Sequence, residues 1–180
     1  MFIIETDRLI LRPLTQSDWK DTLEHRIDRE NNKYISNMTE EEIRKVFEEK
    51  IQPWWQEDNK WLSLGVELKE NKKLIGEVGF RYIDKKSSLG EFGYRFNRNF
   101  HGKGYATEAS IALVNKLFEE LKIHKLVAIC DTENIPSFKI MEKLGMKKEA
   151  HYKDHSWRRD KWCDEYVYSL FNPGYRESNR

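Results

Sequence analysis

The sequence predicts a single α/β (α+β) domain with a mixed, mostly antiparallel sheet flanked by helices, in the order β-α-α-β-β-β-α-β-α-β-β. Apolar residues alternate with a period of two in the middle of the chain and recur at helical spacing on either side of it. No repeat, low-complexity tract or Pro/Gly/Ser-rich linker divides the 180 residues. Residues 1–180 are therefore expected to form one domain with one core.

The N-terminal third is predicted to hold one extended segment and two helices. Residues 2–14, FIIETDRLILRPL, form the extended segment, and Thr15 with Asp18 indicates the start of a short helix. Thr39 and Glu42 have the spacing of a capping box in front of a second helix. The apolar face of that helix holds Ile43, Val46, Phe47 and Ile51.

The middle of the chain is predicted to form a meander of three antiparallel strands. Residues 61–68, 74–83 and 89–97 each alternate between apolar and polar or small side chains, and short polar turns separate them. Links as short as these favour antiparallel neighbours. A long helix is expected to begin near Tyr105. Its apolar face holds Ile111, Val114, Leu117, Phe118 and Leu121.

The C-terminal part is predicted to add a strand, a helix and a hairpin. Residues 124–131 are apolar enough for a buried strand, and residues 134–145 have the pattern of a short helix. Residues 151–171 are typical of two strands that are joined near Arg159 and Asp160.

The charge of the chain argues against several classes of partner. Charged residues make up 35% of the sequence, yet they nearly cancel to a formal net charge of +1, which is not typical of a protein that binds nucleic acid. A weaker alternative is RNA binding at the tip of the last hairpin, through Arg158, Arg159, Lys161 and Trp162.

No apolar run approaches the ~18 residues of a membrane span, so no membrane partner is expected. Because charges appear within the first eight residues, a signal peptide is not indicated and we expect a cytoplasmic protein.

The two cysteines do not indicate a metal or a disulfide framework. Cys130 and Cys163 are not part of a CxxC or Cys/His spacing. Two free thiols and no metal are therefore expected.

A pair of glycines marks the candidate binding loop. Gly102 and Gly104 lie on either side of one lysine, between a strand that ends near Asn97 and a helix that begins near Tyr105. Such a turn can direct backbone N–H groups outward, and the helix dipole adds positive potential, which suits a pyrophosphate. The dinucleotide fingerprint is not matched, because Thr107 occupies the position of its third glycine. A purely structural tight turn is the alternative interpretation.

The chain also resembles a known family. HGKGYA, residues 101–106, is similar to the [Q/R]-x-x-G-x-[G/A] coenzyme A loop of the GNAT N-acetyltransferases, with His101 in the usual Gln/Arg place. LVAICDTENIPSFKIMEKLGM is similar to the strand and helix that follow in that family. The segments ETDRLILRPLTQSDW and KWCDEYVYSL resemble the branch of ribosomal-protein N-terminal (alanine/serine) acetyltransferases.

This resemblance implies a binding mode for acetyl-CoA as the acetyl donor. The cofactor would lie between the strands at residues 89–97 and 125–131, which splay apart in the family. Backbone groups of Tyr94, Phe96 and Asn97 would bind the pantetheine arm, and the N–H near Phe96 could stabilise the oxyanion. The loop amides that would hold the pyrophosphate belong to His101, Gly102, Lys103, Gly104, Tyr105 and Ala106.

A catalytic base is expected because an alkylamine is mostly protonated at neutral pH. Glu91 is the candidate, since related enzymes often have a glutamate on this strand. Period-two geometry places Glu91 and Arg95 on one face of the strand. The alternative is that Glu91 forms a structural ion pair with Arg81 or Arg95.

The proton donor for the leaving thiolate is expected to be Ser137. Many GNAT enzymes use a tyrosine in the last helix, but the matching position here is Met141. The alternative role of Ser137 is to cap the helix. Asn134 matches the family residue that binds the pantetheine arm or an ordered water, and it too could be the helix cap.

These inferences together predict an acetyl-CoA-dependent N-acetyltransferase. The acetyl group would move directly to a primary amine in a ternary complex, and the acceptor would be a protein N-terminal α-amine or a small molecule. The alternative is a non-catalytic acyl-CoA-binding sensor, which would keep the glycine loop without the catalytic groups. A homodimer that uses the last hairpin is possible by analogy with relatives.

Overall fold

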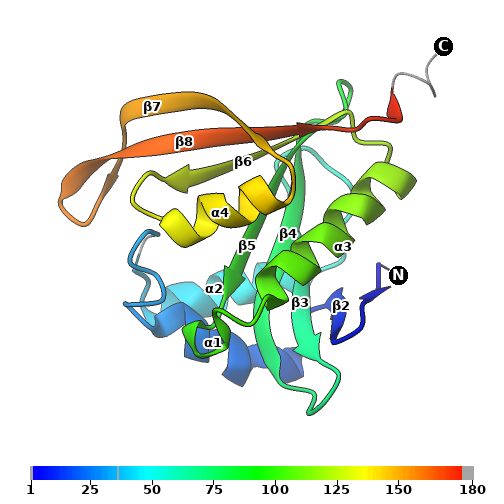
Figure 1. Ribbon diagram of the computed structural model, residues 1–180. Helices are drawn as coiled ribbons and strands as arrows, with labels where there is room; N and C mark the ends of the chain where they lie inside the picture. The colour runs from blue at the N-terminus through cyan, green and yellow to red at the C-terminus, as the bar shows by residue number, and fades with distance from the viewer. Residues whose placement is uncertain (1, 36, 176–180) are drawn as a thin grey trace.

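The computed structural model describes residues 2–35 and 37–175 and folds them into one eight-stranded sheet with helices on both faces (Figure 1). The strands are β1 (Ile4–Glu5), β2 (Leu9–Pro13), β3 (Leu62–Leu68), β4 (Leu74–Asp84), β5 (Leu89–Phe96), β6 (Lys125–Asp131), β7 (Lys147–Arg158) and β8 (Lys161–Phe171). Their spatial order is β1-β2-β3-β4-β5-β6-β8-β7, and each neighbouring pair is antiparallel except β5 with β6. The predicted mixed, mostly antiparallel sheet is confirmed.

Helices cover both faces of this sheet. They are α1 (Trp19–Ile27), α2 (Glu40–Lys50), α3 (Tyr105–Glu120) and α4 (Ile135–Lys143), with 3-10 turns at η1 (Gln16–Asp18) and η2 (Arg98–Phe100). The pair α3 and α4 covers one face, and the pair α1 and α2 covers the other (Figure 1). Within the described ranges, no helix is long and apolar enough to cross a membrane.

The order of elements follows the prediction except at the N-terminus, where the single extended segment is two strands. The amide of Thr6 donates to the carbonyl of Leu9 (3.0 Å), and the amide of Leu9 donates to the Thr6 hydroxyl (3.0 Å). These two bonds close a tight turn, so that β1 folds back antiparallel on β2. The turn falls in a run of four polar residues, 5–8, that interrupts the apolar pattern, so the prediction of one continuous extended segment was wrong here.

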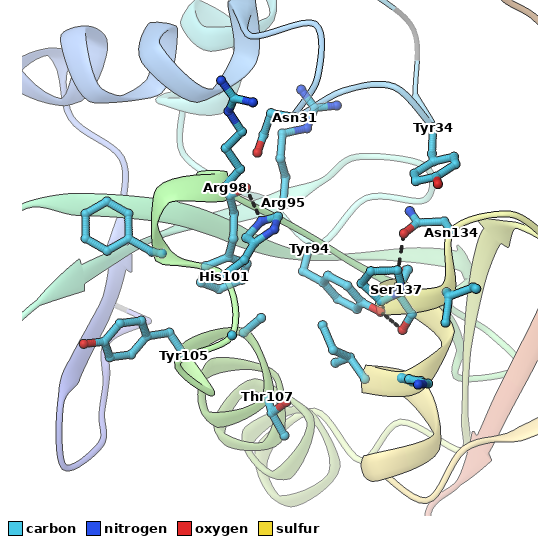
Figure 2. A pocket seen from close by; sticks show the side chains of 18 of the residues that line it. Asn31, Tyr34, Tyr94, Arg95, Arg98, His101, Tyr105, Thr107, Asn134 and Ser137 are labelled. Atoms are coloured by element: carbon cyan, nitrogen blue, oxygen red, sulfur yellow. Dashed lines mark hydrogen bonds between the residues drawn. The ribbon is translucent and has the colours of Figure 1, made fainter.

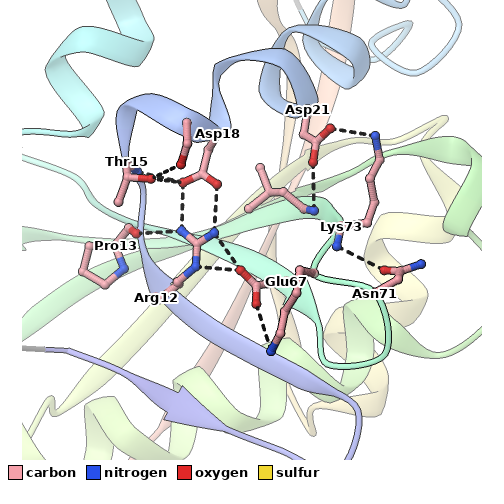
Figure 3. Close-up of polar contacts among 11 residues, drawn as sticks. Arg12, Pro13, Thr15, Asp18, Asp21, Glu67, Asn71 and Lys73 are labelled. Carbon is pink, nitrogen blue, oxygen red and sulfur yellow. Dashed lines mark hydrogen bonds and ion pairs between the residues drawn. The ribbon is translucent and has the colours of Figure 1, made fainter.

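The predicted start of the first helix is held by an ion-pair network as well as by its cap (Figure 3). The Asp18 carboxylate accepts the Thr15 amide (2.7 Å) and two bonds from the Arg12 guanidinium (2.8 Å each). Arg12 also donates to Glu67 on β3 (2.9 Å). The network therefore fastens β2, η1 and β3 together at the edge of the α1–α2 layer.

The parallel pair β5–β6 is short, and this creates the site. The two strands pair only from Leu89 to Glu91, opposite Lys125 to Val127. Beyond that point β6 continues against β8, as far as the pair of Asp131 with Glu165. The two central strands therefore separate, as the family resemblance implied, and Figure 1 shows α3 and α4 on either side of the point where they part.

Candidate active site

A cavity of about 810 Å³ lies where β5 and β6 separate. Its wall is formed by the loop between α1 and α2, the end of β5, the glycine loop that leads into α3, and the first turns of α4 (Figure 2). The site thus combines segments from four distant parts of the chain. The predicted site residues that line it are Tyr94, Phe96, His101, Gly102, Gly104, Tyr105, Ala106, Asn134 and Ser137.

The glycine loop presents backbone amides to this cavity. Gly102 and Gly104 have φ angles of 76° and 82°, a left-handed region in which glycine has no steric penalty. Gly104 is also the N-cap of α3, so the first amides of that helix point out of its N-terminus. In the described part of the chain, the amides of residues 102–104 donate to no backbone carbonyl. Unpaired amides at a helix N-terminus are well suited to bind phosphate oxygens.

Two contacts hold the loop in this shape. The His101 ring lies with Nε2 3.0 Å from the Phe96 carbonyl, which fixes the loop against the end of β5. From the other side, the Arg8 guanidinium donates to the Lys103 carbonyl (3.0 Å) and pairs with Glu108 on α3 (2.6 Å). Arg8 was not singled out from the sequence, because its contacts lie about 100 residues away. Lys103 itself is not among the residues that line the cavity.

The Tyr94 hydroxyl on β5 meets the Ser137 hydroxyl in the first turn of α4. The Tyr94 hydroxyl donates to the Ser137 carbonyl (2.7 Å) and lies 3.0 Å from the Ser137 hydroxyl (Figure 2). Burial raises the pKa of Tyr94, so its hydroxyl keeps its proton at neutral pH. Asn134 is the N-cap of α4 and accepts the Ser137 amide (3.3 Å). Capping therefore belongs to Asn134, and the Ser137 hydroxyl is left to face Tyr94.

The remaining predicted residues lie outside the cavity wall. Glu91 forms an ion pair with Arg81 (2.5 Å), which is one of the two structural partners considered for it. Asn97 is buried, and its side-chain amide donates to Glu24 (2.8 Å). Both residues are close to the site along β5, but neither side chain is among those that line the cavity.

Sequence reasoning missed the residues that line the α1–α2 side of the cavity. Asn31, Tyr34 and Arg95 line this wall, and Figure 2 shows the Arg95 side chain directed toward Asn31. Asn31 and Tyr34 belong to an irregular loop, in which no periodic pattern identifies the residues that face inward. Arg95 was placed on the correct face of its strand, but only as a possible partner for Glu91.

Neither cysteine is presented to the cavity. Cys130 and Cys163 are free thiols with exposed fractions of 7% and 4%. Burial raises the pKa of Cys130 to about 11, so very little thiolate forms at neutral pH. The predicted free thiols are confirmed.

Two central strands that separate in front of a glycine loop and a helix N-terminus define a fold that can take an extended nucleotide thioester. Comparison with known proteins agrees: a family model described as an acetyltransferase (GNAT) domain matches residues 8–147. The chain therefore belongs to the GNAT acetyltransferase family, and the predicted N-acetyltransferase class is confirmed.

Individual relatives support this assignment. The uncharacterized N-acetyltransferase YnaD of Bacillus subtilis (strain 168) is 35% identical over 169 residues, which cover 93% of this chain and 95% of that protein. A GNAT-family acetyltransferase structure from Bacillus anthracis has a TM-score of 0.85 at 31% identity and covers 95% of this chain and 99% of that one. A ribosomal protein uS5-alanine N-acetyltransferase of Escherichia coli (strain K12) is 27% identical over 105 residues, or 58% of this chain and 54% of that protein. The predicted resemblance to that branch is confirmed.

Proposed function

We propose that this N-acetyltransferase moves the acetyl group of acetyl-CoA directly to a primary amine within a ternary complex. In this reaction the thioester C–S bond breaks and an amide C–N bond forms. The amine gives up one proton, and the coenzyme sulfur leaves as a thiol. The observation that carries the proposal is the single cavity that joins the unpaired glycine-loop amides to the Tyr94 and Ser137 hydroxyls.

The residues of this chain fit the coenzyme at each part of its length. The amides from His101 to Ala106 would hold the pyrophosphate, and the backbone of Tyr94 to Asn97, where β5 has separated from β6, would bind the pantetheine arm. Asn134 would lie beside the same arm. No metal is required for this chemistry.

Two side chains are proposed for proton transfer. The Ser137 hydroxyl would protonate the leaving thiolate, and Tyr94, whose hydroxyl donates to the Ser137 carbonyl, would hold Ser137 in position. Glu91 is the proposed base. Because it lies outside the cavity wall, it would receive the amine proton through water.

Direct transfer is favoured over an acetyl-cysteine intermediate. Both thiols are buried, and the raised pKa of Cys130 disfavours the thiolate that such an intermediate needs. The kinetic pattern tests this point. Initial velocities with both substrates varied should give intersecting lines, whereas parallel lines would indicate a covalent intermediate.

The proposed acceptor is a small-molecule amine or a protein N-terminal amine; one relative is named as a ribosomal protein uS5-alanine N-acetyltransferase. Thiol release from acetyl-CoA, measured across amines, amino acids and N-terminal peptides, tests the proposed activity. Tight binding of coenzyme A without release of thiol for any acceptor would favour the acyl-CoA sensor instead.

A homodimer through the β7–β8 hairpin is a further proposal. Trp157 and Trp162 are more than half exposed there and lie against one another, with ring centroids 5.4 Å apart. Exposed tryptophans are enriched in protein interfaces. Light scattering of the wild type and of Trp157→Ser/Trp162→Ser should show a dimer that the double variant loses.

A further inference from the structure

Arg95 has an unusual position in the wall of the cavity. It lies near the end of β5, and its guanidinium points away from α3 and toward the loop between α1 and α2 (Figure 2). Among the residues that the structure describes, Arg95 has no ion pair and no side-chain hydrogen bond. A cationic side chain that is mostly withdrawn from water normally has a partner.

The carboxylate nearest in the sheet does not provide one. Glu77 on β4 lies directly opposite Arg95 in the ladder, but it binds the Arg26 guanidinium through two bonds of 2.7 Å. It also accepts from Lys50 (2.7 Å) and lies 3.2 Å from the His25 ring. Its oxygens are therefore fully engaged on the α1–α2 side.

The cluster around Glu77 consequently has an excess of positive charge. Three cationic side chains, Arg26, Lys50 and Arg95, surround this one carboxylate. Burial and the neighbouring Arg26 lower the pKa of Arg95 to about 10, so it remains charged at neutral pH. An anion bound at Arg95 would offset this excess, and the cavity is the side from which an anion could approach.

A second unsatisfied polar group belongs to Asn31, in the same wall of the cavity. The Asn31 side-chain amide donates to the His25 carbonyl (2.9 Å), which fixes its orientation and directs Oδ1 the other way. That oxygen is buried and has no hydrogen-bond partner among the described residues. A buried acceptor without a partner is destabilising, but this oxygen is enclosed by the protein, so Arg95 is the ligand-binding group of this wall.

The coenzyme phosphates do not account for Arg95. Side chains alternate along β5, so Arg95 lies on the opposite face from Tyr94 and Phe96. The glycine loop and the N-terminus of α3 belong to the other face of the sheet (Figure 1). The unpaired guanidinium therefore lies in the part of the cavity that the coenzyme phosphates would leave free.

From this arrangement we infer that the acceptor is a primary amine that carries a carboxylate, which the Arg95 guanidinium binds. The planar guanidinium matches a carboxylate through two parallel bonds. Glu30, which is exposed, is the one carboxylate among the side chains that line the cavity in the described ranges. A polycationic acceptor would therefore lack a counter-charge here and would be repelled by Arg95. This inference rests on the proposed function and narrows its substrate class.

The carboxylate could come from a free amino acid or from an acidic side chain near a peptide N-terminus. Matched acceptor pairs distinguish these sources. One arm compares amino acids with the amines that lack only the carboxylate, such as lysine with cadaverine. The other compares C-terminally amidated peptides that have Asp or Asn as the second residue. We expect the carboxylate-bearing member of at least one pair to have a kcat/KM higher by roughly 10- to 100-fold, the range of a charge-assisted hydrogen bond. Equal use of both members in both arms would overturn the inference.

Variants at Arg95 test the assigned residue. Arg95→Gln should abolish the preference by raising KM for the carboxylate-bearing acceptor, while KM for acetyl-CoA stays the same; Arg95→Lys should restore part of it. The matched control is Lys33→Gln, which removes an exposed positive charge at the rim of the same cavity and should keep the preference. Loss of the preference in Lys33→Gln, or its retention in Arg95→Gln, would contradict the assignment.

A binding measurement separates this inference from the proposed function. Calorimetry with coenzyme A present measures acceptor binding without turnover. If no amine releases thiol, the proposed function fails, yet weaker binding of a carboxylate-bearing amine to Arg95→Gln than to wild type would still support the role of Arg95. Equal binding to both proteins would overturn that role, whatever the activity.

Discussion

Arg95 lies directly opposite Glu77 across the β4–β5 ladder, yet the Glu77 carboxylate bonds Arg26, Lys50 and His25 and leaves Arg95 to the cavity. One buried carboxylate thus joins α1, α2 and β4 behind the site. Arg95 on β5 stays without an ion-pair partner and faces the cavity. The same cluster supports the scaffold and sets the charge of the cavity.

Glu77→Gln is expected to lower the free energy of unfolding by about 3–5 kcal/mol, because it leaves Arg26 and Lys50 buried without a counter-charge. Glu77 has an exposed fraction of 3%, so water cannot replace the lost partner. Denaturant unfolding followed by fluorescence or circular dichroism measures the change. Glu70→Gln, at an exposed glutamate, is the control and should change stability by less than ~0.5 kcal/mol.

The same residue gives a pH dependence with a defined sign. Burial alone would raise the pKa of Glu77, but Arg26 and Lys50 hold it well below its ordinary value. A carboxyl group whose folded-state pKa is depressed stabilises the fold above its unfolded pKa of about 4.3, and this contribution is lost as the pH falls toward the folded-state pKa. Wild-type stability should therefore decline below about pH 4.5 more steeply than that of Glu77→Gln. If the stabilities of the wild type and of Glu77→Gln declined equally steeply below pH 4.5, this assignment would be contradicted.

Gly102→Val and Gly104→Val are expected to raise KM for acetyl-CoA by ~10-fold or more while the protein stays folded. Backbone strain at their φ angles of 76° and 82° should cost about 1–3 kcal/mol each. A Cβ at Gly102 meets no protein atom within 4 Å, and one at Gly104 is 3.4 Å from Arg8. Crowding within the protein is therefore slight. The rise in KM is expected because the new side chains would occupy the space where the coenzyme approaches the loop.

Gly145→Val is the matched control for this loop. Gly145 also has a left-handed φ of 81°, but it lies after α4 and is not among the residues that line the cavity. It should lose a similar amount of stability without a change in KM for acetyl-CoA. If all three variants changed KM equally, the glycine loop would have no special role in binding.

Gly104 could be predicted as a binding residue from the sequence, whereas the unpaired state of Arg95 could not. The glycine loop was predictable because its chemistry is local: two glycines, a helix start and a preceding strand stand next to one another in the chain. The lack of an ion-pair partner for Arg95 was not predictable, because it depends on three residues from α1 and α2 that bind Glu77 instead. Such competition is decided only when distant segments pack together. The fold itself was largely predictable, since alternation and capping boxes are local signals as well.

Ser137→Ala and Tyr94→Phe should each lower kcat by roughly 10- to 100-fold, with little change in KM for acetyl-CoA. The two hydroxyls lie 3.0 Å apart, so they are expected to act as one unit. The double variant should therefore be no slower than the slower single variant. Because Asn134 caps α4, Ser137→Ala should also keep wild-type stability. Losses in kcat that multiply would show that the hydroxyls act independently.

Glu91→Gln is expected to reduce kcat by about 100-fold if Glu91 accepts the amine proton. The competing explanation is structural, because Glu91 pairs with Arg81 at 2.5 Å and lies outside the cavity wall. Arg81→Gln separates the two, since it breaks the same ion pair and keeps the carboxylate. We expect Arg81→Gln to retain turnover and to shift the melting temperature as much as Glu91→Gln does. Full turnover of Glu91→Gln across the pH range would show that the base is elsewhere, and Glu91 would then have only its ion pair with Arg81 on the neighbouring strand β4.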